Sequence, residues 1–280
     1  LKEMEIPLKK AGVIKEELSK EGLKFIRREH LGEKIYYLVN HTPNIIEGLI
    51  PLGIQSKEVL ILDPLTGKRG KAITEQGADI TKVKLSLPSG ASVFLKTFDM
   101  VSTAKWKYYN PSEKSYQISG NWDFKIIKGG PDNEYSKKIN HLTSWTQWGE
   151  KMAAFSGTAQ YEIKFNRPAD REGPWLLKLG DVRESAKVWL NNQYLGTLCS
   201  NPYQLNIKNL KKGKNILSIQ VTNSGSNRIK AKEARGEEWK IFYNINVVGL
   251  DYQPFDASKL DVLDAGLLEA PLLTPLEIFE

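Results

Sequence analysis

Alternation of apolar and polar residues runs through most of this 280-residue chain, from Leu23 to near its end. Successive side chains of a strand point to opposite faces, so this alternation predicts β-strands with one buried face. The clearest case is AQYEIKF, in which Ala159, Tyr161, Ile163 and Phe165 alternate with polar residues. A slip of one residue would turn all four apolar side chains to water, so the register of this strand is well specified.

The first half of the chain predicts a small β-sandwich. Residues 21–100 hold about seven short apolar segments separated by turns, a spacing typical of antiparallel sandwiches. In one of them, KIYYLVN, the side chains of Ile35, Tyr37 and Val39 share a face. Residues 1–20 are rich in Lys, Glu and Leu, and predict a helical lead-in or linker.

Residues 101–119 predict a connector, and residues 120–280 a second antiparallel β-sandwich. The dipeptide Asn191-Asn192 lies between two strands and predicts a hairpin turn, because asparagine tolerates the positive φ that such turns need. We expect the apolar phases of these strands to be buried on facing sheets and to form the core, namely Tyr161, Ile163, Val188, Leu190, Leu217 and Ile219.

Two later segments break this regularity. The polar stretch SGSNRIKAKEARGEEW predicts a long loop between strands, of the kind that is often functional. The last segment, GLLEAPLLTPLEIFE, predicts a strand pair interrupted by Pro271 and Pro275. Proline lacks a backbone donor, so this pair is expected at the margin of a sheet.

Composition places the chain among soluble globular proteins, with 40% hydrophobic and 26% charged residues. No apolar run approaches the ~18 residues of a membrane span. A single cysteine, Cys199, excludes internal disulfides and cysteine-based zinc sites. The three histidines are far apart in sequence, so no cofactor is expected, although a structural calcium ion stays compatible with the sequence.

The net charge of +7 raises nucleic acid as a partner. The lysines are interleaved with acidic residues along the whole chain, however, and no recognition motif accompanies them. We therefore expect a solvated basic surface and no nucleic-acid partner.

The chain begins Leu1-Lys-Glu-Met, on what reads as a helix in progress, and we expect it to be a piece of a longer protein.

Catalytic motifs are not apparent in the sequence. It holds no nucleophile elbow, phosphate-binding loop or zinc-binding helix. Glycoside hydrolysis needs two carboxyl groups that face each other at a fixed separation, and nothing pairs Glu184, Glu233, Glu237 and Glu238. We interpret these four as solvated loop acids and predict no catalytic residue.

Exposed aromatic residues are the main candidates for ligand binding. An exposed indole can stack on the apolar side of a sugar ring, while amide and charged groups bind its hydroxyls. Trp145 and Trp148, in SWTQWG, are candidates for such a platform, although most aromatic residues must belong to the core. Trp189 lies between Val188 and Leu190, so it points away from the core if those two point into it.

Three polar residues follow a predicted strand in the segment TNSGSNR. Asn223, Asn227 and Arg228 have the directional donors and acceptors that bind sugar hydroxyls. The same groups can instead fix the long loop by bonding its backbone, which is the interpretation that we favour.

The order of motifs in the second half resembles a known family of domains. The segments FSGTAQYEIKF, GPWLLKLGDVRESAKVWLNNQYLGTL and NPYQLNIKNLKKGKNILSIQVTNSGSNR resemble the galactose-binding-like, jelly-roll sandwich of family 2 glycoside hydrolases. They also resemble the module that ends bacterial proteins of the family 106 α-L-rhamnosidase type. FDAS and GLL near the terminus match such proteins, and FIRREHLGEKIYYLVNHTP with ILDPLTGKRG resembles, more loosely, the preceding sandwich.

This resemblance implies the non-catalytic C-terminal part of a glycoside hydrolase, located in the periplasm or secreted. Its expected partners are the upstream catalytic domain of the same polypeptide and carbohydrate, a plant or host glycan. In the family the catalytic acids lie upstream, so no catalytic residue carries over. Two alternatives stay open from the residues themselves: a purely structural module without ligand, and a self-contained polysaccharide-degrading enzyme.

Overall fold

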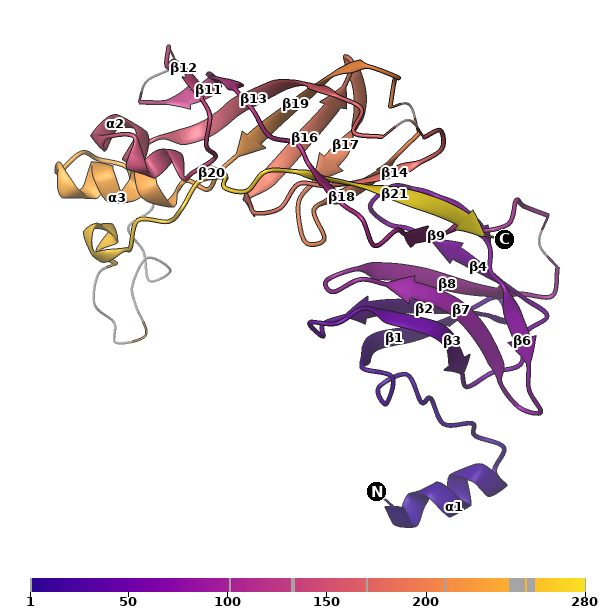
Figure 1. Ribbon diagram of the computed structural model, residues 1–280. Coiled ribbons are helices and arrows are strands. Elements are labelled where there is room, and N and C mark those ends of the chain that lie inside the picture. The colour runs from indigo at the N-terminus through magenta and orange to yellow at the C-terminus, as the bar shows by residue number, and fades with distance from the viewer. Residues whose placement is uncertain are drawn as a thin grey trace. The chain divides into compact units, whose positions relative to one another are not determined.

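The computed structural model describes residues 2–100, 102–131, 134–169, 171–208, 210–241, 250 and 255–279. The chain divides into two compact units (Figure 1). Unit 1 comprises Leu1–Asn110 with Glu277–Glu280, and unit 2 comprises Pro111–Leu276. The break after Asn110 falls inside the predicted connector, whereas Glu277–Glu280 group with unit 1 instead of the second module.

Unit 1 is a β-sandwich preceded by the helix α1 (Lys2–Lys10), as predicted. One sheet has the strand order β1-β2-β8-β4-β5 and the other has the order β3-β7-β6. The strands are β1 (Leu23–His30), β2 (Glu33–Asn40), β3 (Ile46–Leu52), β4 (Glu58–Leu62), β5 (Arg69–Lys71), β6 (Thr74–Gln76), β7 (Thr81–Leu87) and β8 (Ser92–Phe98).

In strand β2, the face that packs into the core carries Tyr36 and Leu38. The other face, with Ile35, Tyr37 and Val39, is only half-buried. Both phases of this strand are apolar, so alternation alone does not identify the inner one. On the outer face the ring centroids of Tyr37 and Phe94 are 4.8 Å apart.

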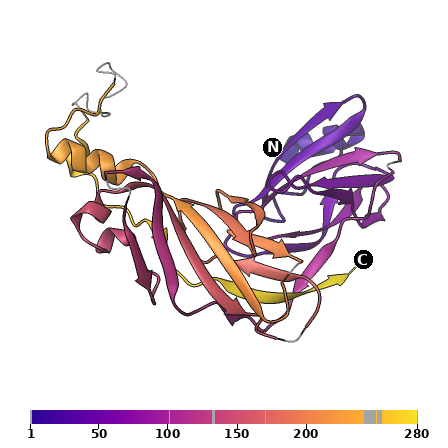
Figure 2. The same ribbon diagram turned by 90° about the horizontal axis from the view of Figure 1, so that it is seen from above.

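Unit 2 is also a β-sandwich, and β12-β11-β13-β19-β16-β17 form its larger sheet. The second sheet has the order β10-β21-β14-β18, with β9 (Tyr108–Pro111) also on β21, and β15 pairs with β20. The long strands of the larger sheet, rose to orange in Figure 2, are twisted. The strands are β10 (Tyr116–Gln117), β11 (Trp122–Gly130), β12 (Ser136–Ile139), β13 (Ser156–Asn166), β14 (Trp175–Lys178), β15 (Val182–Arg183), β16 (Ser185–Leu190), β17 (Gln193–Leu198), β18 (Gln204–Ile207), β19 (Lys214–Thr222), β20 (Gly266–Leu267) and β21 (Leu272–Phe279).

Short helices follow some of these strands: η1 (Trp145–Gln147), α2 (Glu150–Ala153), α3 (Ser226–Ala234) and η3 (Ala257–Lys259). No helix among the described residues is long and apolar enough to cross a membrane.

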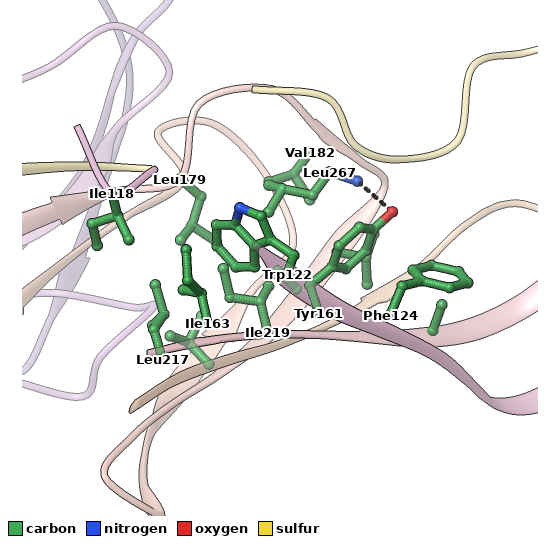
Figure 3. Close-up of a cluster of buried hydrophobic side chains, with 14 of the residues drawn as sticks. Ile118, Trp122, Phe124, Tyr161, Ile163, Leu179, Val182, Leu217, Ile219 and Leu267 are labelled. Carbon is green, nitrogen blue, oxygen red and sulfur yellow. Dashed lines mark hydrogen bonds between the residues drawn. The ribbon is translucent and has the colours of Figure 1, made fainter. Parts of the chain in front are cut away.

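The core of unit 2 contains the six residues that alternation predicts. Their exposed fractions are 3% or less, and they share one core cluster with Leu177 of the opposite sheet. Figure 3 shows four of them, Tyr161, Ile163, Leu217 and Ile219. The expectation that the six lie on facing sheets is wrong, because all of them come from β13, β16 and β19 of the larger sheet. Tyr161 pairs directly with Ile219, which also pairs with Val188, so three strands meet at one point of the core. The hydroxyl of Tyr161 accepts a hydrogen bond from the backbone N–H of Leu267 at 3.2 Å. The all-β fold and the register of β13 are therefore confirmed.

The hairpin turn at Asn191-Asn192 is confirmed as well. Both residues have positive φ, 51° and 67°, and they join β16 to β17. The side chain of Asn191 accepts a hydrogen bond from Ile216 N–H and donates one to the buried Asn215, both at 2.9 Å. This turn is thus fixed to the neighbouring strand β19.

The predicted long loop after β19 is wrong in part, because it contains the helix α3. The KAKEA stretch within α3 consists of strong helix formers, a signal that the polar character of the segment concealed. Lys230 in α3 donates hydrogen bonds to the carbonyl groups of Ser258 and Leu260, which tie the helix to the segment around η3.

The terminal strand is also not at a margin, since β21 lies between β10 and β14. Pro275 is tolerated there because of its position in the ladder. It lies opposite Trp175, and its carbonyl group accepts a hydrogen bond from Ser112 N–H at 2.9 Å. The ladder to β14 continues one residue later, where Leu276 N–H donates to the carbonyl group of Pro174.

Burial raises the pKa of Tyr161 well above its ordinary value. Above ~pH 10 the folded chain therefore holds a proton that the unfolded chain releases, and the free energy of unfolding should fall as the pH rises further. We expect the free energy of unfolding of Tyr161→Phe, measured by urea unfolding at several pH values, to fall less steeply above ~pH 10 than that of the parent chain. Tyr194→Phe, at a side chain that is 52% exposed, is the control and should keep the slope of the parent chain. Equal slopes in all three proteins would contradict the assignment.

Candidate functional site

The structure corrects the expectation for Trp145. Its side chain is fully buried, and its ring lies 5.6 Å from that of Phe155 and 6.1 Å from that of Phe124. Trp145 therefore has no exposed face to offer a sugar. It lies in the short helix η1, where strand alternation does not apply, so its burial could not be read from the sequence pattern.

Trp148 is half-buried, and other side chains surround it. Its Nε1 donates to Thr143 Oγ1 at 3.1 Å, and the ring of Tyr135 is nearly parallel to it at 6.4 Å. The ammonium group of Lys137 lies 5.3 Å from the centre of the indole. A sugar that stacked on Trp148 would have to displace Tyr135 or Lys137, so this residue is a poorer platform than its sequence context suggests.

The two asparagines that follow β19 are bonded to the backbone. Asn223 accepts from Gly157 N–H at 2.9 Å and donates to the carbonyl group of Phe155 at 3.0 Å. Asn227 is buried and makes a reciprocal pair with the backbone of Leu263, at 2.7 and 2.9 Å. Both amides thus fix the loop, which is the role that we favoured from the sequence.

Arg228 packs against glycine. Its guanidinium group lies so close to Gly130 that a Cβ atom there would be 2.2 Å from Nη1. Gly130 thus leaves room for this side chain. The contact explains the position of Arg228 without a ligand, although it does not test the predicted role in binding sugar.

Trp189 occupies the position that its phase predicts, on the outer face of the six-stranded sheet. It pairs with Tyr194 on one side and with Ser218 on the other, and Ser218 in turn pairs with Glu162. Directly paired residues of an antiparallel sheet point to the same face, with Cβ atoms about 5 Å apart. The ring centroids of Trp189 and Tyr194 are 5.3 Å apart, and their planes are tilted by 51°.

A second row of polar residues lies beside this one. Lys187 pairs with Gln220, which pairs with Gln160, and the two amides are joined by a hydrogen bond of 3.1 Å. We call the two rows together the Trp189 face, which comprises Gln160, Glu162, Lys187, Trp189, Tyr194, Ser218 and Gln220. An aromatic pair beside amide, hydroxyl and carboxylate groups provides the contacts that a saccharide needs.

The hairpin turn at Asn191-Asn192 positions the tyrosine of this face. Leu190 pairs with Gln193 across the turn, which places Tyr194 opposite Trp189. A β-bulge follows at Leu195, so that Val188 pairs with Gly196. Sequence reasoning found Trp189 but missed its neighbours, because they come from three other strands.

Two of the four acidic residues considered in the sequence, Glu233 and Glu237, have partners in the structure. Glu233 accepts hydrogen bonds from Trp239 Nε1 and Lys240 Nζ, and the Arg235 guanidinium lowers the pKa of Glu237. A general acid needs a raised pKa. Every carboxyl group of the described residues whose pKa departs from its ordinary value is shifted downward instead, namely Glu29, Glu237 and Asp256.

The described residues also contain no group of three or more His, Cys, Asp or Glu side chains arranged for a metal ion.

Comparisons of sequence and of structure find proteins that are similar to parts or most of this chain. No protein-family model matches the chain. Over 123 residues it is 32% identical to a protein of Formosa agariphila named "Putative beta-glucuronidase", a match that covers 41% of this chain and 10% of that protein. A rhamnosidase structure from Novosphingobium sp. PP1Y matches 90% of the chain with a TM-score of 0.67 and 24% sequence identity. The chain spans 24% of that rhamnosidase, and it shares the fold of that part.

Proposed function

We propose that this chain is a non-catalytic accessory region of a glycoside hydrolase related to α-L-rhamnosidases. It supports a catalytic domain elsewhere in the same polypeptide, in the periplasm or outside the cell, and binds a plant or host glycan. Its fold, which matches part of a rhamnosidase, supports this proposal. So does its local sequence identity with a protein named as a glycosidase.

The observation that carries the binding role is the Trp189 face. Trp189 and Tyr194 form an aromatic pair at the edge of the sheet, where the apolar side of a sugar ring can stack. Across the next strands, Ser218 and Glu162 follow in the same row, with donors and acceptors for hydroxyl groups. A saccharide that lies across the strands can therefore stack the apolar side of one sugar ring on the aromatic pair and place its hydroxyl groups at Ser218 and Glu162.

The test is binding to a panel of plant and host polysaccharides by affinity gel electrophoresis. Trp189→Ala and Tyr194→Ala should each weaken binding about tenfold, an effect equivalent to about 1.4 kcal/mol. Tyr37→Ala removes an aromatic residue from a similar pair in unit 1 and should bind as the parent chain does. The bound glycan should be recovered uncleaved, as the proposed non-catalytic role requires.

Unchanged binding in Trp189→Ala, or an equal loss in Tyr37→Ala, would contradict the assignment of this face.

The second candidate function is a structural module without ligand. It is favoured by Asn223 and Asn227, whose amides are used to bond the backbone. Failure of the parent chain to bind any glycan of the panel would support this alternative.

A further inference from the structure

A groove of about 440 Å³ lies in unit 2, where β13 ends and β19 begins. Strand β13 contributes Lys164, Phe165 and Asn166 to its lining, β19 contributes Lys214, and β10 contributes Tyr116. We call it the lysine groove. Its volume is in the range of pockets that bind small ligands.

The register of the sheet brings the two lysines together. Asn166 pairs directly with Lys214, and Lys164 lies two residues before Asn166, so all three side chains leave the same face. All three are exposed. Two ammonium groups and an amide thus converge at the end of one strand pair.

The lining of the groove carries positive charge and no acid. No Asp or Glu is among its lining residues, and neither Lys164 nor Lys214 has an ion-pair partner among the described residues. Glu162, on the same face of β13, is the acid two residues from Lys164. Elsewhere in the chain lysines such as Lys71 and Lys96 are paired with carboxylates.

One wall of the groove is an aromatic ring held in place by the core. The ring of Tyr116 meets that of the fully buried Trp175 edge to face, with centroids 6.1 Å apart. A third ammonium group, that of Lys114, lies 5.1 Å from the centre of the Tyr116 ring. Lys114 adds further positive charge beside the groove.

The two lysines of the groove lie on the same sheet face as the Trp189 face, further along β13 and β19. Lys164 pairs with Ile216, and Ile216 lies two residues before Ser218 on the same face of β19. From Ser218 to Lys214 the strand advances about 13 Å, a distance that an extended oligosaccharide can span. A glycan that stacks on Trp189 can therefore place a further unit at the lysines.

We infer that the lysine groove binds an anionic substituent of the glycan, a carboxylate or a sulfate. Lys164 and Lys214 pair with the anion, Asn166 binds a neighbouring hydroxyl group, and the rings of Tyr116 and Phe165 border the apolar part of the sugar. This inference rests on the proposed function and names the class of saccharide that the chain prefers.

The experiment compares the binding of three probes by the whole 280-residue chain: an oligogalacturonate, its neutral methyl ester and a sulfated galactan oligosaccharide. At low ionic strength, the parent chain should bind at least one anionic probe about tenfold more tightly than the neutral ester. Added salt should reduce this preference, because the pairs are exposed. The carboxylated and sulfated probes show which anion is preferred.

The double substitution Lys164→Gln with Lys214→Gln should abolish the preference and leave binding of the neutral ester unchanged. Lys138→Gln with Lys178→Gln is the matched control, since it removes the same charge from exposed positions of unit 2 outside the groove. It should keep the preference. Thermal unfolding of both double variants verifies that they fold.

Equal binding of the neutral and anionic probes by the parent chain would overturn the inference. A preference that survives in the groove variant, or one lost equally in the control, would overturn it too. If the neutral ester still binds through Trp189, the proposed function stands without the anion site. If no saccharide binds, both fail.

Discussion

Replacing Gly266 by alanine is expected to destabilise unit 2 by about 3 kcal/mol or more. Gly266 has a φ of 111°, a conformation that side-chain-bearing residues rarely adopt. A Cβ atom there would lie 2.4 Å from the hydroxyl oxygen of Tyr161 and 3.0 Å from the ring of Trp145. Both neighbours are fully buried, so neither can move without disturbing the core. Urea unfolding followed by tryptophan fluorescence measures the loss.

Two further substitutions separate crowding from backbone strain. Gly213 has a φ of 79° but open space around its Cα, so Gly213→Ala bears the strain alone and should cost about 1–2 kcal/mol. Tyr161→Phe should cost about 1–3 kcal/mol by itself, because it leaves the N–H of Leu267 without its acceptor. In the Gly266→Ala background the same change removes the clashing oxygen and should cost less. Equal losses of stability in Gly266→Ala and Gly213→Ala would refute crowding as the cause. Additive losses when Gly266→Ala and Tyr161→Phe are combined would refute it too.

The sequence predicts the core of unit 2 well because the outer phase of its long strands is mostly polar, with Trp189 and Ile216 as exceptions. Tyr161 and Leu217 are each flanked by residues of intermediate exposure, and only their own phase can be buried at low cost. In β2 both phases are apolar, and the choice between Tyr36 and Tyr37 depends on the opposite sheet. Trp145 lies in a helical turn, where an alternating pattern carries no information.

The candidate sites depend on contacts between residues distant in the sequence, which explains why only Trp189 could be predicted. Its partner Tyr194 is set by the register of the hairpin, and Ser218 by the pairing of β16 with β19. The lysine groove joins β10, β13 and β19, which are separate in sequence. A strand pattern gives the face of each residue but not the neighbour across the ladder, since that needs the register of every pair.

Leu190→Ala is expected to cost about 2–5 kcal/mol of the free energy of unfolding of unit 2. Leu190 is 3% exposed and pairs with the fully buried Leu217, so its truncation leaves a cavity in the core. This is a large part of the ~5–15 kcal/mol that stabilises a typical domain. Urea unfolding measures the difference.

Trp189→Ala, one residue earlier in the same strand, is the matched control. Its side chain is half-buried on the outer face and contacts the exposed Tyr194 instead of the core, so the free energy of unfolding should fall by less than in Leu190→Ala, by about 1 kcal/mol. The two neighbours thereby separate stability from binding. Leu190→Ala that still folds should bind glycan as the parent chain does, whereas Trp189→Ala should lose binding. A larger loss of stability in Trp189→Ala than in Leu190→Ala would mean that Trp189, and not Leu190, faces the core. The Trp189 face would then have no basis.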